Sequence, residues 1–157
     1  MPGVGKSSIG VILAKELGCR FTDADLVIQE REGRLLKEII AAEGIDGFLN
    51  AESEALLSIK EDGAVIATGG SAVYSDEAMR HLKETGTVVY LRLPYEDLRK
   101  RLGNLRNRGV VLREGQSLKD LFEERTPLYE KYADAVVDEK GLNHEETLAA
   151  LLRVLSR

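Results

Sequence analysis

Short apolar segments alternate with longer segments of helical periodicity along this 157-residue chain. Residues 64–67 read Ala-Val-Ile-Ala, residues 88–93 form a second apolar run, and a helical pattern follows each. Strands that alternate with helices build parallel sheets, because the chain must cross over the sheet before it enters the next strand. The chain is therefore predicted to have an α/β fold, a doubly wound parallel sheet flanked by helices.

The predicted elements follow one another without a repeat or a linker, so residues 1–157 are expected to form a single domain. The helix at residues 6–17 is expected to bury Ile9, Ile12, Leu13 and Leu17 and to end at Gly18. Further helices are expected at residues 26–42 with a break near residue 33, and at 46–61, 76–84, 94–102, 118–132 and 145–155. Strands are expected to end near residue 22 and to span residues 64–67, 88–93 and 135–137. Residues 103–115 lack a clean period and are predicted to be a mobile loop.

Composition and charge narrow the range of partners. The chain carries 22 basic and 27 acidic residues, a net charge of -5, which argues against broad capture of nucleic acid or of an anionic membrane. Cys19 is the only cysteine, so neither an internal disulfide nor a cysteine metal cluster can form. No segment resembles a membrane span or a signal peptide. We expect a cytoplasmic monomer that binds a small molecule.

The first eight residues match the end of a phosphate-binding loop, or P-loop, of nucleotide-binding proteins. Glycines let the backbone approach phosphates, and the amides of the following helix N-terminus point at them. Lys6 is expected to neutralise the β- and γ-phosphates and the Ser7 hydroxyl to coordinate Mg²⁺. The alternative is a flexible glycine-rich start, which the helical pattern from residue 6 disfavours. The predicted nucleotide-binding residues in this loop are Gly3, Val4, Gly5, Lys6, Ser7 and Ser8.

The full P-loop pattern begins with a glycine five residues before Gly5, just ahead of Met1, and a strand normally leads into it. In a doubly wound sheet that strand usually lies in the middle, so its absence would leave a gap between two neighbouring strands. Two explanations are open. Met1 is an internal methionine of a longer sequence, which we favour, or the chain lacks its first strand.

An acidic pair, Asp23 and Asp25, follows the first predicted strand. Both carboxylates leave the carboxyl end of the sheet, where ligands bind in such folds. One carboxylate can organise Mg²⁺ or its waters, and the other can accept a hydrogen bond from a substrate hydroxyl, and its proton. Alone, two aspartates with this spacing are as often solvated turn residues. Their place after the P-loop helix favours a role in binding and catalysis.

With these motifs the chain resembles shikimate kinase from Gly3 to its C-terminus. The shared features are the glycine-lysine-serine loop, the strand that ends in two aspartates, a Thr-Gly-Gly turn, an arginine-bearing lid and an Arg-x-Pro-Leu-Tyr motif. The resemblance implies a five-stranded parallel P-loop fold, a substrate-binding helical region at about residues 24–62 and a lid at about 103–115. It also implies ATP and Mg²⁺ as cofactors.

The resemblance assigns roles to individual residues. Asp23 would join Ser7 at the metal, and Asp25 would contact the substrate hydroxyls as a catalytic group beside Lys6. Gly69 and Gly70, after Thr68, would meet the substrate through backbone amides. Three arginines would act as ligands unless they are merely solvated: Arg101 at the adenine, Arg108 as a catalytic lid residue at the phosphates, and Arg125 at the substrate carboxylate. Residues 138–143 would close over the purine. No role is assigned to His81 or His144, and Tyr129 and Tyr132 are expected to pack in the core.

Three positions depart from the family pattern. Leu49 stands where the family has an arginine that grips the carboxylate, Ser71 replaces a third glycine, and Gly109 replaces the proline after the lid arginine. Leucine cannot make the bidentate contact that a guanidinium makes with a carboxylate. The alternative is that Leu49 simply packs in the core with Leu56. The leading hypothesis is ATP-dependent phosphorylation of shikimate to shikimate 3-phosphate. The alternatives are a kinase of the same fold for homoserine or a sugar acid, and a nucleotide-binding module without turnover.

Overall fold

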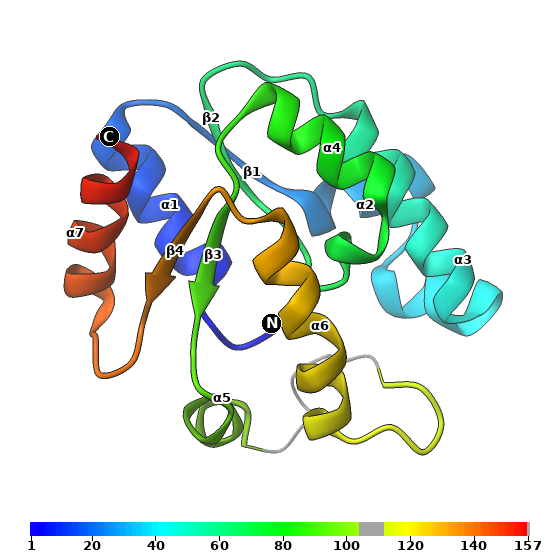
Figure 1. The fold of residues 1–157 in the computed structure, drawn as a ribbon. Helices are drawn as coiled ribbons and strands as arrows, with labels where there is room; N and C mark the ends of the chain where they lie inside the picture. Colours follow the sequence, from blue (N-terminus) through cyan, green and yellow to red (C-terminus); the bar gives the residue numbers. More distant parts are fainter. Residues whose placement is uncertain (104–111, 157) are drawn as a thin grey trace.

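The computed structural model describes residues 1–103 and 112–156. Within them, four short strands pair in two parallel sheets (Figure 1). In the first sheet β1 (Arg20–Asp23) pairs with β2 (Ala64–Ala67), and in the second β3 (Val89–Arg92) pairs with β4 (Ala135–Asp138). Helices separate the strands along the chain, which confirms the predicted α/β class and its parallel strands.

A gap separates the two sheets, as the sequence predicts. In the described part of the chain, β2 pairs only with β1 and β3 only with β4. The chain ahead of the first helix runs into this gap, and Met1 and Val4 are buried there. A small cavity of about 70 Å³ remains between these two residues and β3. The N-terminal residues therefore form part of the core between the two two-stranded sheets, which we call the half-sheets.

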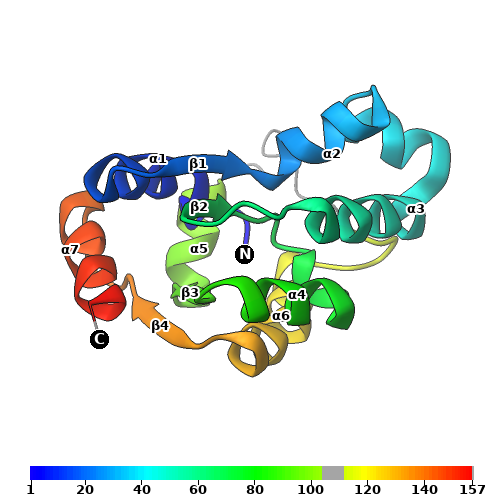
Figure 2. The same ribbon diagram turned by 90° about the horizontal axis from the view of Figure 1, so that it is seen from above.

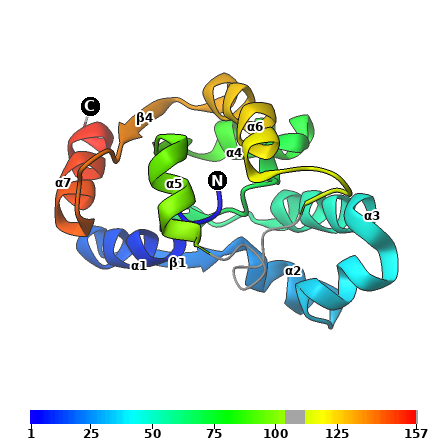
Figure 3. The same ribbon diagram turned by 90° about the horizontal axis from the view of Figure 1, so that it is seen from below.

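Helices surround the two sheets (Figure 2). In chain order the helices are α1 (Lys6–Leu17), α2 (Ala24–Glu32), α3 (Leu36–Ser58), α4 (Asp76–Thr85), α5 (Tyr95–Leu102), α6 (Leu118–Tyr132) and α7 (His144–Leu155), with a short 3₁₀ turn, η1 (Ala72–Tyr74), after β2. The first and last helices pack against each other, α4 packs beside α3, and α5 contacts α6. α2 and α3 extend away from the strands, at the opposite end of the molecule from α7 (Figure 3).

The predicted helices at residues 26–42 and 46–61 have different bounds in the structure. The first begins earlier, at Ala24, because the Asp23 side chain caps it by accepting a hydrogen bond from the Asp25 amide. It ends at Gly33, as expected. The remaining residues form α3, whose only non-helical residue is Gly44, with φ 73° and ψ -176°. The expected boundary between two helices is thus a kink at glycine within one long element.

The predicted buried face of α1 is only half correct. Ile9 and Leu13 are buried, but Ile12 and Leu17 are 38% and 48% exposed. The helix instead turns Gly10 toward β1, and a Cβ at Gly10 would lie 2.7 Å from the ring of Phe21. Close packing of that ring on the glycine rotates the helix, so that Ile12 and Leu17 face outward.

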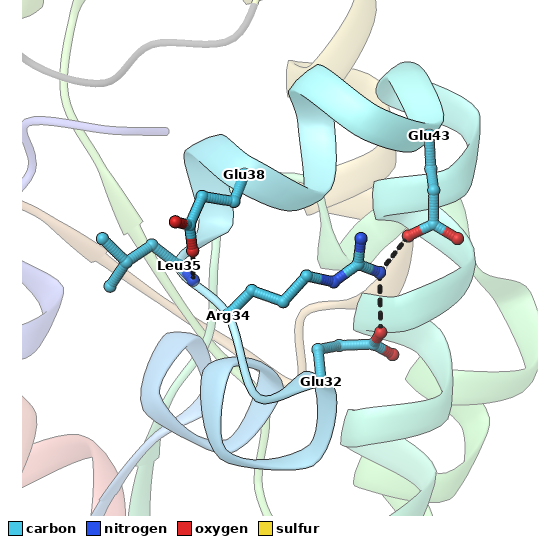
Figure 4. A network of polar contacts seen from close by, with 5 residues as sticks. All are labelled: Glu32, Arg34, Leu35, Glu38 and Glu43. Carbon is cyan, nitrogen blue, oxygen red and sulfur yellow. Dashed lines mark hydrogen bonds and ion pairs between the residues drawn. The ribbon is translucent and has the colours of Figure 1, made fainter.

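An ion-pair network ties the end of α2 to the start of α3 (Figure 4). Arg34 lies between Glu32, at 3.1 Å, and Glu43. The Leu35 amide donates a hydrogen bond of 2.6 Å to Glu38. Exposed ion pairs contribute about 0–1 kcal/mol each to stability. The network therefore connects the two helices but adds little to the stability of the whole fold.

Two hydrophobic clusters hold the molecule together. The larger one fills the space between the sheets and their helices and includes Leu91, Leu98 and Leu121. The smaller one lies between α2 and α3, where Ile28, Ile39, Phe48, Ala51 and Ala55 are buried. None of the helices in the described ranges is long and apolar enough to cross a membrane. Most of the predicted mobile loop, residues 104–111, lies outside the described residues.

Candidate active site

A cavity of about 950 Å³ opens at the carboxyl ends of β1 and β2. Its walls come from the loop before α1, the two strand ends, α3, η1 and α6. Parallel strands place their carboxyl ends at one edge of a sheet, and ligands bind there in open α/β folds. The fold brings the following predicted site residues to this cavity: Gly3, Gly5, Lys6, Ser7, Ser8, Asp23, Asp25, Gly69, Gly70 and Arg125.

One end of the cavity is built as an anion site. Gly5 precedes α1 with φ 83°, a left-handed conformation that favours glycine, and no side chain caps the helix start. The first amides of α1 are thus free to bind phosphate oxygens. The Lys6 ammonium donates a hydrogen bond of 2.6 Å to the Met1 carbonyl. Burial lowers the pKa of Lys6 to about 8, against the opposing effect of the Asp25 charge.

Ser7 and Asp23 provide two oxygens at the border of the anion site. The Ser7 hydroxyl donates a hydrogen bond of 2.9 Å to one Asp23 oxygen, and the other Asp23 oxygen accepts from the Asp25 amide. This separation is also the spacing of neighbouring ligand oxygens around an octahedral ion with metal–oxygen distances of about 2.0–2.1 Å. A serine hydroxyl, one carboxylate and phosphate oxygens are the donors that Mg²⁺ prefers. The two residues fit a magnesium ion.

A second carboxylate, Glu52, lies beside Asp25 and was missed by the sequence analysis as a site residue. A Cβ at Gly69 would be 2.5 Å from Glu52 Oε2 and 3.3 Å from Asp25 Oδ1, so both oxygens face this glycine. Glu52 is only 2% exposed. Its Oε1 accepts a hydrogen bond of 2.6 Å from the Ser71 hydroxyl, and its Oε2 has no hydrogen-bond partner in the described structure. Burial, and then the Asp25 charge, raise the pKa of Glu52 to about 7. Burial, and then Asp23, also raise the pKa of Asp25.

Arg125 forms the opposite wall. This residue is only 7% exposed, and its guanidinium lies 2.9 Å from the point where a Cβ would stand on Gly70. Arg125 Nε donates a hydrogen bond of 3.2 Å to the Tyr74 hydroxyl, and the guanidinium carbon lies 5.3 Å from the centre of the Tyr74 ring. The Tyr129 hydroxyl donates a hydrogen bond of 2.7 Å to the Gly70 carbonyl. These contacts hold both the arginine and the glycine turn in place, and they show Tyr129 as a packing residue, as predicted.

The wall contributed by α3 is mostly apolar. Leu49 lines the cavity and packs on the small cluster between α2 and α3, rather than beside Leu56, which belongs to the larger cluster. Glu52 stands one helical turn after Leu49, and that i,i+3 spacing was the signal that could have placed it in the site. The cavity-lining residues of α3 are Leu36, Lys37, Ile40, Ala41, Ile45, Phe48, Leu49 and Glu52.

Two predicted residues, Val4 and Arg101, do not line this cavity, and a third lies outside the described residues. The Val4 side chain is buried in the main core, which leaves only its backbone for a ligand. Arg101 is absent from the cavity lining and lies near Glu139, whose pKa is raised by burial and partly lowered by the Arg101 charge. Arg108 lies outside the described residues. Of the histidines, His81 contacts the Ile59 carbonyl at 2.7 Å, far along the chain from the site.

Comparison with known proteins places this site in a family. A family model described as shikimate kinase matches residues 2–156. The chain belongs to the shikimate kinase family. The shikimate kinase of Thiobacillus denitrificans is 38% identical over 98% of this chain and 83% of that protein. Threonine synthase-like 1 of Macaca fascicularis is 36% identical over 99% of this chain, but the match covers 21% of that protein.

A solved structure agrees with the family assignment. The shikimate kinase from Acinetobacter baumannii, determined in complex with shikimate, superposes with a TM-score of 0.82 at 33% identity. The superposition covers 98% of this chain and 88% of the other. The architecture of the family therefore extends over nearly the whole chain, including the half-sheets on both sides of the gap.

Proposed function

We propose that this chain transfers the γ-phosphoryl group of ATP to a hydroxyl group of shikimate. The observation that carries the proposal is that a single cavity contains an anion site next to a site suited to a hydroxy acid. Lys6 and the free amides of α1 form an anion site at one end, and Asp25, Gly70 and Arg125 form a hydroxy-acid site beside it. Membership of the shikimate kinase family supports the same reaction.

Each residue has a role that follows from its position. Lys6 and the α1 amides bind the phosphates and offset the charge that develops as the phosphoryl group moves. Asp25 accepts a hydrogen bond from the acceptor hydroxyl and takes its proton. Its raised pKa makes it a better proton acceptor than an ordinary aspartate. Arg125 binds the acceptor carboxylate, and its contacts to Tyr74 fix the guanidinium before the acceptor arrives.

Magnesium and the remaining predicted ligands belong to the same proposal. Ser7 and Asp23 would hold Mg²⁺, which screens the charge of the phosphate oxygens. The P-loop residues Gly3, Val4, Gly5 and Ser8 would bind phosphates through backbone amides, and Arg101 and Arg108 would contact the nucleotide. We further propose that the protein works as a cytoplasmic monomer on small molecules.

A panel of acceptors tests the proposal. The whole chain is assayed for ADP release with MgATP and shikimate, homoserine or gluconate, and the products are identified by mass spectrometry. The proposal predicts the highest kcat/KM for shikimate and a product with one added phosphoryl group. Faster turnover of either other acceptor would contradict shikimate as the substrate while leaving the kinase activity intact.

The alternative, a kinase of the same fold for another hydroxy acid, rests on the apolar wall. Leu49 lies in the cavity, so α3 contributes no guanidinium to grip a carboxylate. The similarity to threonine synthase-like 1 shows that this domain also occurs within proteins of another name. The same panel separates the two candidates, because the alternative predicts that shikimate is the poorer acceptor.

A further inference from the structure

The acceptor end of the cavity contains few groups that can bind an anion. Lys6 faces the phosphate site, and the wall from α3 is apolar apart from Lys37 and Glu52. Arg125 alone gives one guanidinium for the acceptor carboxylate. A second cationic contact can come from two other described side chains that line the cavity, Lys37 of α3 and Arg113.

Arg113 is positioned on the segment that leads into α6. Its backbone amide donates a hydrogen bond of 3.2 Å to the Gln116 side chain, and the Gln116 side chain donates one of 2.8 Å to Glu124 on α6. Its guanidinium makes a 2.9 Å ion pair with Asp46 of α3. Asp46 does not line the cavity itself but follows the cavity-lining residue Ile45. The backbone of Arg113 is thus held, whereas its side chain contacts an exposed carboxylate near the cavity.

The ion pair with Asp46 is easily exchanged. The side chains of Arg113 and Asp46 are 54% and 84% exposed, and pairs as exposed as this contribute little to stability. A carboxylate that enters the cavity can therefore replace Asp46 as the partner of the guanidinium. Asp46 keeps the arginine beside the cavity until then.

Arg113 and Arg125 line the same cavity, and Tyr74 lines it with them. The Tyr74 hydroxyl accepts a hydrogen bond from Arg125. Each guanidinium presents paired N–H donors, so two guanidinium groups at one cavity can bind a carboxylate together.

We propose that Arg113 determines acceptor specificity by binding the acceptor carboxylate together with Arg125, with Asp46 as the counter-ion that the carboxylate displaces. The inference rests on the proposed function, since it names the group that recognises the acid of that substrate. It assigns the cationic contact that α3 lacks at Leu49 to the segment before α6.

The experiment compares shikimate with its methyl ester, which lacks the negative charge, in the parent chain and in Arg113→Ala. The substitution should raise the KM for shikimate by roughly ten- to hundred-fold, the range for a charged hydrogen bond. The KM for the ester and the KM for ATP should change by less than about twofold. Arg113→Lys should show an intermediate loss, because an ammonium lacks the paired donors. Asp46→Asn should leave the KM for shikimate unchanged or lower it.

Two control variants make the result specific. Arg99→Ala removes an exposed arginine that pairs with Glu96 and does not line the cavity, and it should leave every constant unchanged. Lys37→Ala removes the other cation. A loss with Lys37→Ala but not with Arg113→Ala overturns the inference, and so does an equal loss for shikimate and its ester. A parent chain that does not phosphorylate shikimate would instead refute the proposed function, and the inference with it.

Discussion

At the scale of single residues, the site depends on carboxylates whose surroundings differ. Asp25 lines the cavity and is partly buried, while Glu52 is 2% exposed and held only by Ser71. Both lie against Gly69, so only one side of that residue is available to an acceptor. In the proposed function, Asp25 is the group that would meet the acceptor hydroxyl, and Glu52 would support the glycine turn.

Replacement of Asp25 by asparagine should affect the chemical step. The variant keeps the size of the side chain but cannot accept the hydroxyl proton, so kcat should fall by about 10²- to 10⁴-fold, the usual contribution of a general base. The KM for ATP should stay near that of the parent, because the proposed partner of Asp25 is the acceptor hydroxyl rather than the phosphates. Steady-state kinetics check both values. A variant that loses ATP affinity but keeps its kcat would show that the roles of Asp23 and Asp25 are exchanged.

Leu49→Arg should add a cationic contact to the apolar wall. Glu52 is one helical turn away and can hold the new side chain by an i,i+3 pair. Affinity for shikimate should then rise by up to roughly ten- to hundred-fold. The KM for shikimate is measured together with the thermal midpoint, since the leucine also packs on the cluster between α2 and α3. A well-folded variant without any gain for shikimate would favour the alternative acceptor.

Glu52→Gln should change how stability depends on pH. The folded protein raises the pKa of Glu52 from 4.5 to about 7, so the folded state holds a proton that the unfolded state has lost between these values. The free energy of unfolding of the parent should fall as pH rises through this window. Glutamine keeps the bond to Ser71 without the charge, so its advantage over the parent should grow by on the order of 2–3 kcal/mol from pH 4.5 to pH 8. Urea unfolding measures it, and Glu145→Gln, on the exposed start of α7, is the control.

If the difference in the free energy of unfolding between Glu52→Gln and the parent does not change with pH, the raised pKa of Glu52 in the folded protein is contradicted. It would instead show that the Glu52 carboxyl group has the same pKa in the folded and unfolded states.

At the scale of elements, the kink in α3 directs the second half of the helix into the site. Gly44 has φ 73° and ψ -176°, a conformation that essentially only glycine adopts, although a Cβ there would meet nothing within 4 Å. The residues after it carry Phe48, Leu49 and Glu52 to the cavity. The element therefore needs this glycine for its backbone rather than for space.

Gly44→Ala should destabilise the fold by about 1–3 kcal/mol, the cost of this conformation for a residue with a Cβ. If the strain is relieved by a change in the kink, the KM for shikimate should rise as well. Chemical denaturation and steady-state kinetics check the two effects. The control is Ala42→Gly, which stands outside the kink in the same exposed stretch and should cost only about 1 kcal/mol. Equal stability of Gly44→Ala and the parent would show that the kink is not fixed by residue 44.

Local patterns predicted most elements, but not the way they pack. The helix at residues 6–17 and the end of the helix at Gly33 follow from periodicity and glycine, and both are observed. Outward rotation of Ile12 depends on the ring of Phe21 against Gly10, a contact between two elements. Glu52 was overlooked for the same reason, because its burial depends on Ser71, which is 19 positions away. Arg113 gave no periodic signal, since it lies on an irregular segment.

At the scale of the whole molecule, the cavity depends on both half-sheets. Asp23, Asp25 and Gly69 follow the strands of the first sheet, while Arg125 comes from α6, which leads into β4 of the second. The loop before α1 runs between the two sheets, and Lys6, the first residue of α1, lines the cavity. The sequence predicts a gap between two neighbouring strands but not which two; it is present between β2 and β3, and the buried residues Met1 and Val4 lie beside it. Residues from both halves of the molecule therefore line the cavity.

The most direct test of the account is transfer of radiolabelled γ-phosphate from MgATP to shikimate by the whole chain and by its Lys6→Ala variant. The account predicts labelled shikimate phosphate from the parent and a loss of at least about 10²-fold in the variant, since Lys6 stabilises charge in the transition state. Circular dichroism confirms that both proteins fold. Labelled product in equal amounts from both folded proteins, or none from the parent, would contradict the account.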